Sequence, residues 1–167
     1  MLLVGGASSR FGSPKALIEL DGETLAERGR RVLAQACDEV LVVGKVGELP
    51  FPVLPDAGDV RAPIAGVVGG LRAAANDVCV FLPVDCPRMT AEAIRALGDA
   101  CRDADVPETG PLPGAWAKSA LPLLEQRLAA GPYALYRTYD DLDVAFVDLD
   151  PAIVADVDTP ADLDTLR

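Results

Sequence analysis

The chain has 167 residues, which fits one domain whose core buries about two-thirds of the surface of the unfolded chain. Its formal net charge of −11 opposes binding to nucleic acid or to an anionic membrane through a general basic face. The sequence contains no histidine, which excludes Ser-His-Asp and Cys-His hydrolases and every other mechanism that needs an imidazole base. The chemistry must therefore use carboxylates, cations or a metal ion.

The composition favours a core of aliphatic side chains. Half of the residues are apolar but only 5% are aromatic, a mix that suits buried parallel strands flanked by helices. The longest apolar run falls far short of the roughly 20 residues that a membrane span requires, and no signal-peptide pattern precedes the first strand, so we expect a cytoplasmic protein. The cysteines form no C-x-x-C pair, and we expect reduced, mostly buried thiols at Cys37, Cys79, Cys86 and Cys101.

The negative charge is spread unevenly along the chain. Residues 1–45 carry six basic and six acidic side chains, so all eleven excess negative charges lie beyond this segment. A phosphate-rich ligand is repelled by negative charge and attracted to positive charge. We therefore expect such a ligand to bind near the N-terminus.

The first hundred residues alternate between strand and helix patterns. Continuous apolar runs predict buried strands, and apolar side chains at helical spacing predict helices packed on a sheet. In chain order, the expected elements are a strand at 1–4, a short extended piece at 16–20, a helix at 25–36, strands at 40–43 and 51–54, a helix at 64–75, a strand at 78–82 and a helix capped by Thr90 with Ile94, Leu97 and Cys101 on its inner side. The alternation predicts a doubly wound, parallel α/β sheet with ligands at the carboxyl ends of its strands.

The last third of the chain carries weaker signals. Residues 105–116 are rich in proline and glycine and show no clear element. Residues 119–129 predict a helix, and residues 144–147 predict another strand. Thr159 as a cap, followed by Pro160 at the first helical position, indicates a short terminal helix.

A glycine-rich segment with two cations follows the first strand. Its backbone N–H groups could approach a polyphosphate closely, while Arg10 and Lys15 neutralise the charge. The segment is not a Walker A motif, because Pro14 precedes the lysine and disfavours a helical residue before it. The spacing of the Rossmann motif is also missing. The alternative interpretation is a flexible surface loop with two solvated cations.

Three acidic positions are candidates for metal or ligand binding. Asp85 lies just past the most apolar strand, where a carboxylate can hold Mg²⁺ against phosphate oxygens. Asp156 and Asp158 alternate along an extended stretch, which puts both on one face and could supply a second metal ligand. A helix-capping role is the alternative for this pair, and a turn is the alternative for Asp56, which follows the third strand.

Together these segments resemble the molybdenum cofactor guanylyltransferase family, within the wider group of nucleotide-sugar-type nucleotidyltransferases. The matching motifs cover nearly the whole chain and are Gly5-Gly6-x-Ser8-x-Arg10-Phe11-Gly12-x-x-Lys15 with Leu20-x-Gly22, Pro63-Ile64-Ala65-Gly66, Pro83-x-Asp85-x-Pro87 and Asp156-x-Asp158-Thr159-Pro160. The resemblance implies a mostly parallel sheet of the nucleotide-diphospho-sugar transferase-like, Rossmann-type fold. It further implies one domain over residues 1–167, whose first half binds the nucleotide and whose second half binds the acceptor.

The resemblance also implies roles for individual residues. Arg10, Lys15 and Asp85 would be catalytic, with Mg²⁺ held by Asp85 and by Asp158 as a second ligand. The expected nucleotide contacts are Leu3, Val4, Gly5, Gly6, Lys15, Asp56 and Asp85. The chain departs from the family pattern at two places. Val43-Gly44 stands where an asparagine often helps to hold the nucleoside, and Asp156 and Asp158 stand where asparagines are usual.

The expected reaction is the Mg²⁺-dependent transfer of GMP from GTP to the phosphate of molybdopterin. The alternatives are a related enzyme that uses CTP or a sugar phosphate, and a noncatalytic nucleotide-binding protein. Proteins that deliver or accept the cofactor are candidate partners. For the acceptor pocket the sequence offers residues 108–116 and 133–139, although Trp116 is more typical of a core aromatic than of a ligand contact.

Overall fold

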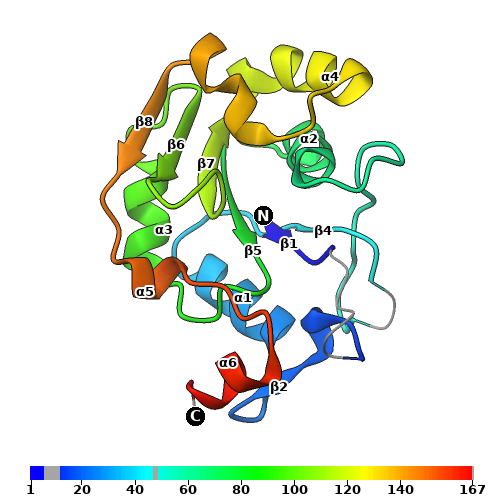
Figure 1. The fold of residues 1–167 in the computed structure, drawn as a ribbon, viewed down its shortest axis with the longest axis vertical. Helices are drawn as coiled ribbons and strands as arrows, with labels where there is room; N and C mark the ends of the chain where they lie inside the picture. Colours follow the sequence, from blue (N-terminus) through cyan, green and yellow to red (C-terminus); the bar gives the residue numbers. More distant parts are fainter. Residues whose placement is uncertain (6–11, 47–48, 167) are drawn as a thin grey trace.

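The computed structural model describes residues 1–5, 12–46 and 49–166 as a sheet with helices on both faces (Figure 1). The strands are β1 (Leu2–Leu3), β2 (Glu19–Leu20), β3 (Glu23–Thr24), β4 (Val42–Val43), β5 (Val78–Pro83), β6 (Ala104–Pro107), β7 (Gly114–Ala117) and β8 (Val144–Val147). The α-helices are α1 (Leu25–Ala34), α2 (Pro63–Ala73), α3 (Ala91–Gly98), α4 (Leu121–Ala130), α5 (Pro151–Val154) and α6 (Pro160–Asp164). Three 3₁₀ helices are η1 (Lys15–Leu17), η2 (Lys118–Ala120) and η3 (Leu135–Asp141).

The main sheet has six strands in the order β4-β1-β5-β7-β6-β8. β1 pairs in parallel with both β4 and β5, and β6 pairs in parallel with β8. β7 is antiparallel to β5 and to β6. The predicted doubly wound α/β architecture is therefore confirmed, with one reversed strand inside an otherwise parallel sheet.

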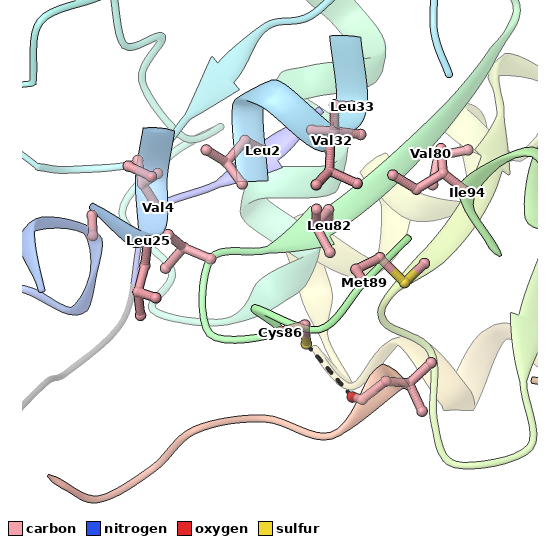
Figure 2. Packing of buried hydrophobic residues seen from close by; sticks show 14 of the residues in the cluster. Leu2, Val4, Leu25, Val32, Leu33, Val80, Leu82, Cys86, Met89 and Ile94 are labelled. Atoms are coloured by element: carbon pink, nitrogen blue, oxygen red, sulfur yellow. Dashed lines mark hydrogen bonds between the residues drawn. The ribbon is translucent and has the colours of Figure 1, made fainter. Parts of the chain in front are cut away.

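The sheet separates two hydrophobic clusters. Successive residues of a strand point to opposite faces, so Leu2 packs with α1 and α3, whereas Leu3 packs with α2 on the other side. Figure 2 shows the first cluster, in which Leu82 from β5 lies among side chains of α1 and α3. The short β1 strand is thus buried on both faces, which fixes the direction in which the chain leaves it.

Within the described residues, side-chain caps fix the starts of four helices, as the sequence predicted for two of them, and at α5 the cap is Asp150, whose carboxylate accepts from the backbone N–H of Ala152. The hydroxyl of Thr90 accepts from the backbone N–H of Ala93 and begins α3. Thr159 and Asp162 form a reciprocal capping box at α6. Thr24 forms the same arrangement at α1. These local hydrogen bonds satisfy N–H groups that have no partner inside the helix.

Several expected elements differ in the structure. Of residues 51–54, only Leu54 forms a bridge, which is parallel and made with Val43. In the segment 16–20, Glu19–Leu20 alone is a strand, and it pairs with β3 in a separate two-stranded sheet. Helix α3 ends at Gly98, so Cys101 lies beyond it. The proline- and glycine-rich segment 105–116 contains most of β6 and β7, which the sequence did not reveal.

Candidate functional site

The carboxyl ends of β4, β1 and β5 meet at one edge of the sheet. Gly5 follows β1 closely, and Gly44 follows β4. Gly44 has a φ of +147°, and a Cβ atom at this position would lie 2.7 Å from the backbone nitrogen of Gly5. The end of β4 therefore packs directly against the start of the glycine-rich segment, at a distance that only glycine permits. This contact gives a physical reason for glycine where the resembled family has asparagine.

The predicted nucleotide contacts after β1 differ in what they can offer. The side chains of Leu3 and Val4 are buried on opposite faces of the sheet, so their contacts with a ligand would involve backbone atoms. Gly5 is exposed at the sheet edge. Gly6 and Arg10 lie outside the residues that the structure describes, and their roles stay predictions.

The carboxylate of Asp56 lies beside this backbone. A Cβ atom built on Gly5 would be 3.9 Å from Asp56 Oδ2, and one built on Gly66 would be 3.6 Å from Oδ1. The next backbone N–H, that of Ala57, donates to the carbonyl oxygen of Ala65 in α2 at 3.0 Å. The structure thus brings Asp56 to the edge of the sheet, between β1 and the first turn of α2. Gly66 belongs to the motif Pro63-Ile64-Ala65-Gly66, but the sequence alone did not indicate that it lies beside Asp56.

Lys15 joins two of the predicted acidic residues. Its Nζ atom donates to Asp85 Oδ2 at 2.8 Å and to Asp158 Oδ1 at 2.7 Å. Burial opposes the charged form of the lysine, but the hydrogen bonds to Asp158 and Asp85 outweigh it, so the pKa of Lys15 is raised. The side chain of Lys15 is 15% exposed, against 26% for Asp85 and 52% for Asp158. Among the described residues, Lys15, Asp85 and Asp158 thus form a charged triad.

The C-terminal segment is hydrogen-bonded to Asp85, which lies just beyond the end of β5. The backbone N–H of Val157 donates to the carbonyl oxygen of Asp85 at 2.8 Å, and the Val157 side chain is buried. The thiol of Cys86 donates to the carbonyl oxygen of Val154 at 3.6 Å, drawn as the dashed line in Figure 2. These two hydrogen bonds hold Asp158 in position opposite Asp85.

Asp156 and Asp158 flank the buried Val157, and both are exposed. This arrangement agrees with the expectation that the two carboxylates share one face. Asp158 reaches Lys15, whereas Asp156 forms no hydrogen bond or ion pair with any residue that the structure describes. Of the two, Asp158 is therefore the one in position to complete a cation site with Asp85.

The two carboxylates fit a hard divalent cation. Their oxygens converge on one positively charged atom, the Lys15 ammonium, at distances typical of charge-assisted hydrogen bonds. Among the described residues, no group of three or more histidine, cysteine or acidic side chains is placed to share a metal ion. Mg²⁺ commonly takes one or two carboxylates and completes its shell with water and phosphate oxygens. The donor set therefore suits a magnesium ion that also binds a phosphorylated ligand.

The two segments suggested for the acceptor lie at different edges of the sheet. Residues 108–113 connect the end of β6 to the start of β7, whose Gly114 pairs with Phe81 toward the carboxyl end of β5. Trp116 is fully buried in β7, as expected of a core aromatic. Residues 133–139 precede β8, whose first residue pairs with the first residue of β6, so they lie at the amino ends of the parallel strands. The second segment is thus remote from Asp85.

A family model and several known proteins match most of this chain. The family model described as "MobA-like NTP transferase domain" matches residues 1–143. A protein of Carboxydothermus hydrogenoformans named "Probable molybdenum cofactor guanylyltransferase" is 29% identical, over 99% of this chain and 92% of its own length. A protein of the same name from Deinococcus radiodurans is 36% identical, over 97% of this chain and 90% of its own length.

Solved structures give the same result for the fold. The crystal structure of molybdopterin-guanine dinucleotide biosynthesis protein A from Archaeoglobus fulgidus superposes with a TM-score of 0.78 at 24% identity, covering 99% of this chain and 94% of that one. No helix within the described part of the chain is long and apolar enough to cross a membrane. The match of the family model to 143 of the 167 residues shows that the chain belongs to the family of MobA-like NTP transferase domains.

Proposed function

We propose that this protein transfers GMP from GTP to the phosphate of molybdopterin, with Mg²⁺ as its cofactor and pyrophosphate as the second product. The observation that carries the proposal is the convergence of Lys15, Asp85 and Asp158 at the ligand edge, next to the backbone of Gly5. The names of two relatives that match nearly the whole chain support the same substrates. A cytoplasmic location suits these substrates.

The reaction needs no general base. A phosphate oxygen of the acceptor forms a bond to the α-phosphorus of GTP, and the bond from that phosphorus to the β-phosphate bridging oxygen breaks. The nucleophile is already ionised at neutral pH, so a site without histidine suffices. Asp85 and Asp158 would hold the Mg²⁺ ion, which would supply charge neutralisation and orientation. Lys15 binds phosphate oxygens, and the backbone near Gly5 positions the nucleotide.

Asp56 supports guanine as the base. Guanine presents two adjacent donors, N1–H and the exocyclic amine, which one carboxylate can accept together. Cytosine presents its amine beside the acceptor N3, which an ionised carboxylate repels. The carboxylate of Asp56 lies beside Gly5 and Gly66, which supports a contact with the nucleotide. This argument favours GTP over CTP even though Gly44 replaces the family's asparagine.

The test measures pyrophosphate release with Mg²⁺ and molybdopterin, offering GTP, CTP, ATP and UTP separately. We expect release with GTP and its loss in Asp85→Asn, a substitution that keeps the size of the side chain. Circular dichroism of the variant checks that the fold is intact. Release with CTP alone would change the base, and nucleotide binding without release would identify a noncatalytic binding protein. Normal turnover in Asp85→Asn would contradict the assigned metal site.

A further inference from the structure

The strongest unexplained feature of the molecule is the position of the Lys15 ammonium. A lysine that serves only to bind phosphate would be expected to face the ligand. Here its Nζ atom lies 2.7 Å from Asp158 Oδ1 and 2.8 Å from Asp85 Oδ2, which is where a cation shared by the two carboxylates would sit. We propose that Lys15 is an internal counterion that competes with the metal ion for Asp85 and Asp158, and moves to the triphosphate when the metal binds. This inference rests on the proposed function.

The two carboxylates cannot hold both cations in this arrangement. An ammonium group and a divalent ion repel each other, and the ammonium already lies between the two carboxylates, against Asp85 Oδ2 and Asp158 Oδ1. The lysine side chain is 15% exposed, so little space is left around the position that it fills. Binding of a metal ion between Asp85 and Asp158 therefore requires the ammonium to leave.

In this triad, the segments that carry the two carboxylates are held together, whereas the Lys15 side chain can move. The backbone hydrogen bond from Val157 to Asp85, at 2.8 Å, ties together the two segments that carry the carboxylates. Lys15 reaches them from the other side on a flexible four-carbon stem, and Pro14 before it is exposed. The carboxylates can thus stay in place while the ammonium moves. A triphosphate at the Gly5 backbone would offer the displaced cation a new set of negative partners.

Competition at these carboxylates couples two binding events. A metal ion that displaces Lys15 frees a cation for the nucleotide, and a nucleotide that attracts Lys15 frees two carboxylates for the metal. By thermodynamic linkage, each ligand must then strengthen the binding of the other by the same factor. The protein itself would contribute to this coupling, in addition to direct contact between the metal and the phosphates.

The test measures the affinity for Mn²⁺ alone, without nucleotide, by electron paramagnetic resonance. Lys15→Met keeps most of the side-chain volume and removes the charge, and we expect it to bind Mn²⁺ at least about tenfold more tightly than the wild type, or about 1.4 kcal/mol. The matched control is Lys118→Met. This substitution changes the net charge by the same amount, but Lys118 lies next to Asp77, before β5 begins. Asp85 lies beyond the other end of that strand. We expect the control to change Mn²⁺ affinity by less than about twofold.

Equal or weaker Mn²⁺ binding in Lys15→Met would overturn the inference, as would equal tightening in both lysine variants. The double variant Lys15→Met/Asp85→Asn distinguishes failure of the counterion inference from failure of the proposed metal site. If it binds Mn²⁺ as tightly as Lys15→Met, Asp85 is not a metal ligand and the proposed site itself is wrong.

Thermal unfolding gives a second measurement that does not depend on activity. Removal of Lys15 leaves Asp85 and Asp158 facing each other without the ammonium that now links them, so Lys15→Met is expected to be less stable than the wild type in the absence of metal. Mn²⁺ should then raise its melting temperature more than that of the wild type, because tighter binding gives greater stabilisation at the same metal concentration. A smaller rise in the variant would contradict the inference.

Discussion

The backbone N–H of Val157 donates to the carbonyl oxygen of Asp85, so the last segment of the chain is bound to the residue that follows its central strand. Lys15 joins the same site from 70 residues before Asp85 and 143 residues before Asp158. The charged triad therefore exists only when both ends of the chain are folded onto the middle. The integrity of the site and the stability of the C-terminal segment are physically linked.

Shortening Val157 should loosen this attachment without changing any charge. Val157 is 3% exposed, and Val157→Ala is expected to lower the free energy of unfolding by about 2 kcal/mol and kcat/KM by about tenfold, since Asp158 is no longer held firmly. Val68→Ala is the control, because Val68 is equally buried but lies in α2 on the other face of the sheet. We expect a similar loss of stability there with little loss of kcat/KM. Urea unfolding and steady-state kinetics measure both, and equal kinetic losses in the two variants would contradict the argument.

Asp56→Asn should reduce the preference for guanine. The amide has one acceptor oxygen where the carboxylate has two, and its NH₂ group would face a donor of the base. We expect the ratio of kcat/KM for GTP over ATP to fall by about tenfold to a hundredfold. Asp59→Asn removes the same charge from an exposed position in the same loop and should leave the ratio unchanged. A preserved ratio in Asp56→Asn would remove this residue from base recognition.

Gly44→Ala should weaken nucleotide binding through a steric contact. Its Cβ atom would lie 2.7 Å from the nitrogen of Gly5, so the Gly5 backbone, which we propose contacts the nucleotide, must shift. Gly58→Ala serves as the control, because Gly58 also has a positive φ, of +77°, but has no atom within 4 Å of the added carbon. We expect the control to lose about 1 kcal/mol of stability from backbone strain and to bind GTP normally. Calorimetric titration with GTP distinguishes the two, and unchanged affinity in Gly44→Ala would show that Gly5 does not hold the nucleotide.

Cys86 should be unreactive in the native protein and should destabilise it at high pH. Burial, together with the negative charges of Asp85 and Asp156, raises the pKa of its thiol from 9.0 to about 12. At pH 8 only about one molecule in ten thousand then carries the reactive thiolate, so alkylation by iodoacetamide should be slow until the protein unfolds.

The same pKa shift sets the direction of the pH effect on stability. Between pH 9 and about 12 the unfolded chain releases the proton of Cys86 while the native protein retains it, so the free energy of unfolding falls as the pH rises through this range. Urea unfolding at pH 8 and pH 10.5 should show a smaller loss for Cys86→Ala than for the wild type. Equal losses would show that this thiol does not contribute.

Elements with strong local signals could be predicted from the sequence. Thr159 and Pro160 specify the start of α6 because the cap and the fixed φ of proline act within a few residues. The apolar run of β5 likewise identifies the central strand. β7 could not be recognised, because its four residues, Gly-Ala-Trp-Ala, have no alternation and follow a proline-rich connection. Its place in the sheet depends on pairing with β5 and β6, which no local pattern encodes.

The candidate site likewise combines residues that local motifs predicted with contacts that depend on the fold. Lys15, Asp85 and Asp158 were each predicted from their own motifs, and the structure brings all three together. The direct ion pairs among them could not be predicted, because they join residues 70 and 143 positions apart in the sequence. The hydrogen bond between Val157 and Asp85 joins backbone atoms, so no particular side chain in the sequence indicates it. The role of Gly5 beside Gly44 also depends on packing between two strands rather than on either motif.

The reversed direction of β7 has a consequence for how this fold can diversify. In a wholly parallel sheet, every strand must be followed by a crossover to the other edge, so a change of loop length at the ligand edge also displaces a helix. Residues 108–113 instead begin and end in neighbouring strands, β6 and β7, at that edge. Insertions there can reshape the surface at this edge of the sheet while every helix keeps its place. The fold thus lets this border of the sheet vary in length independently of the strand ends that lead to Gly5 and Asp85.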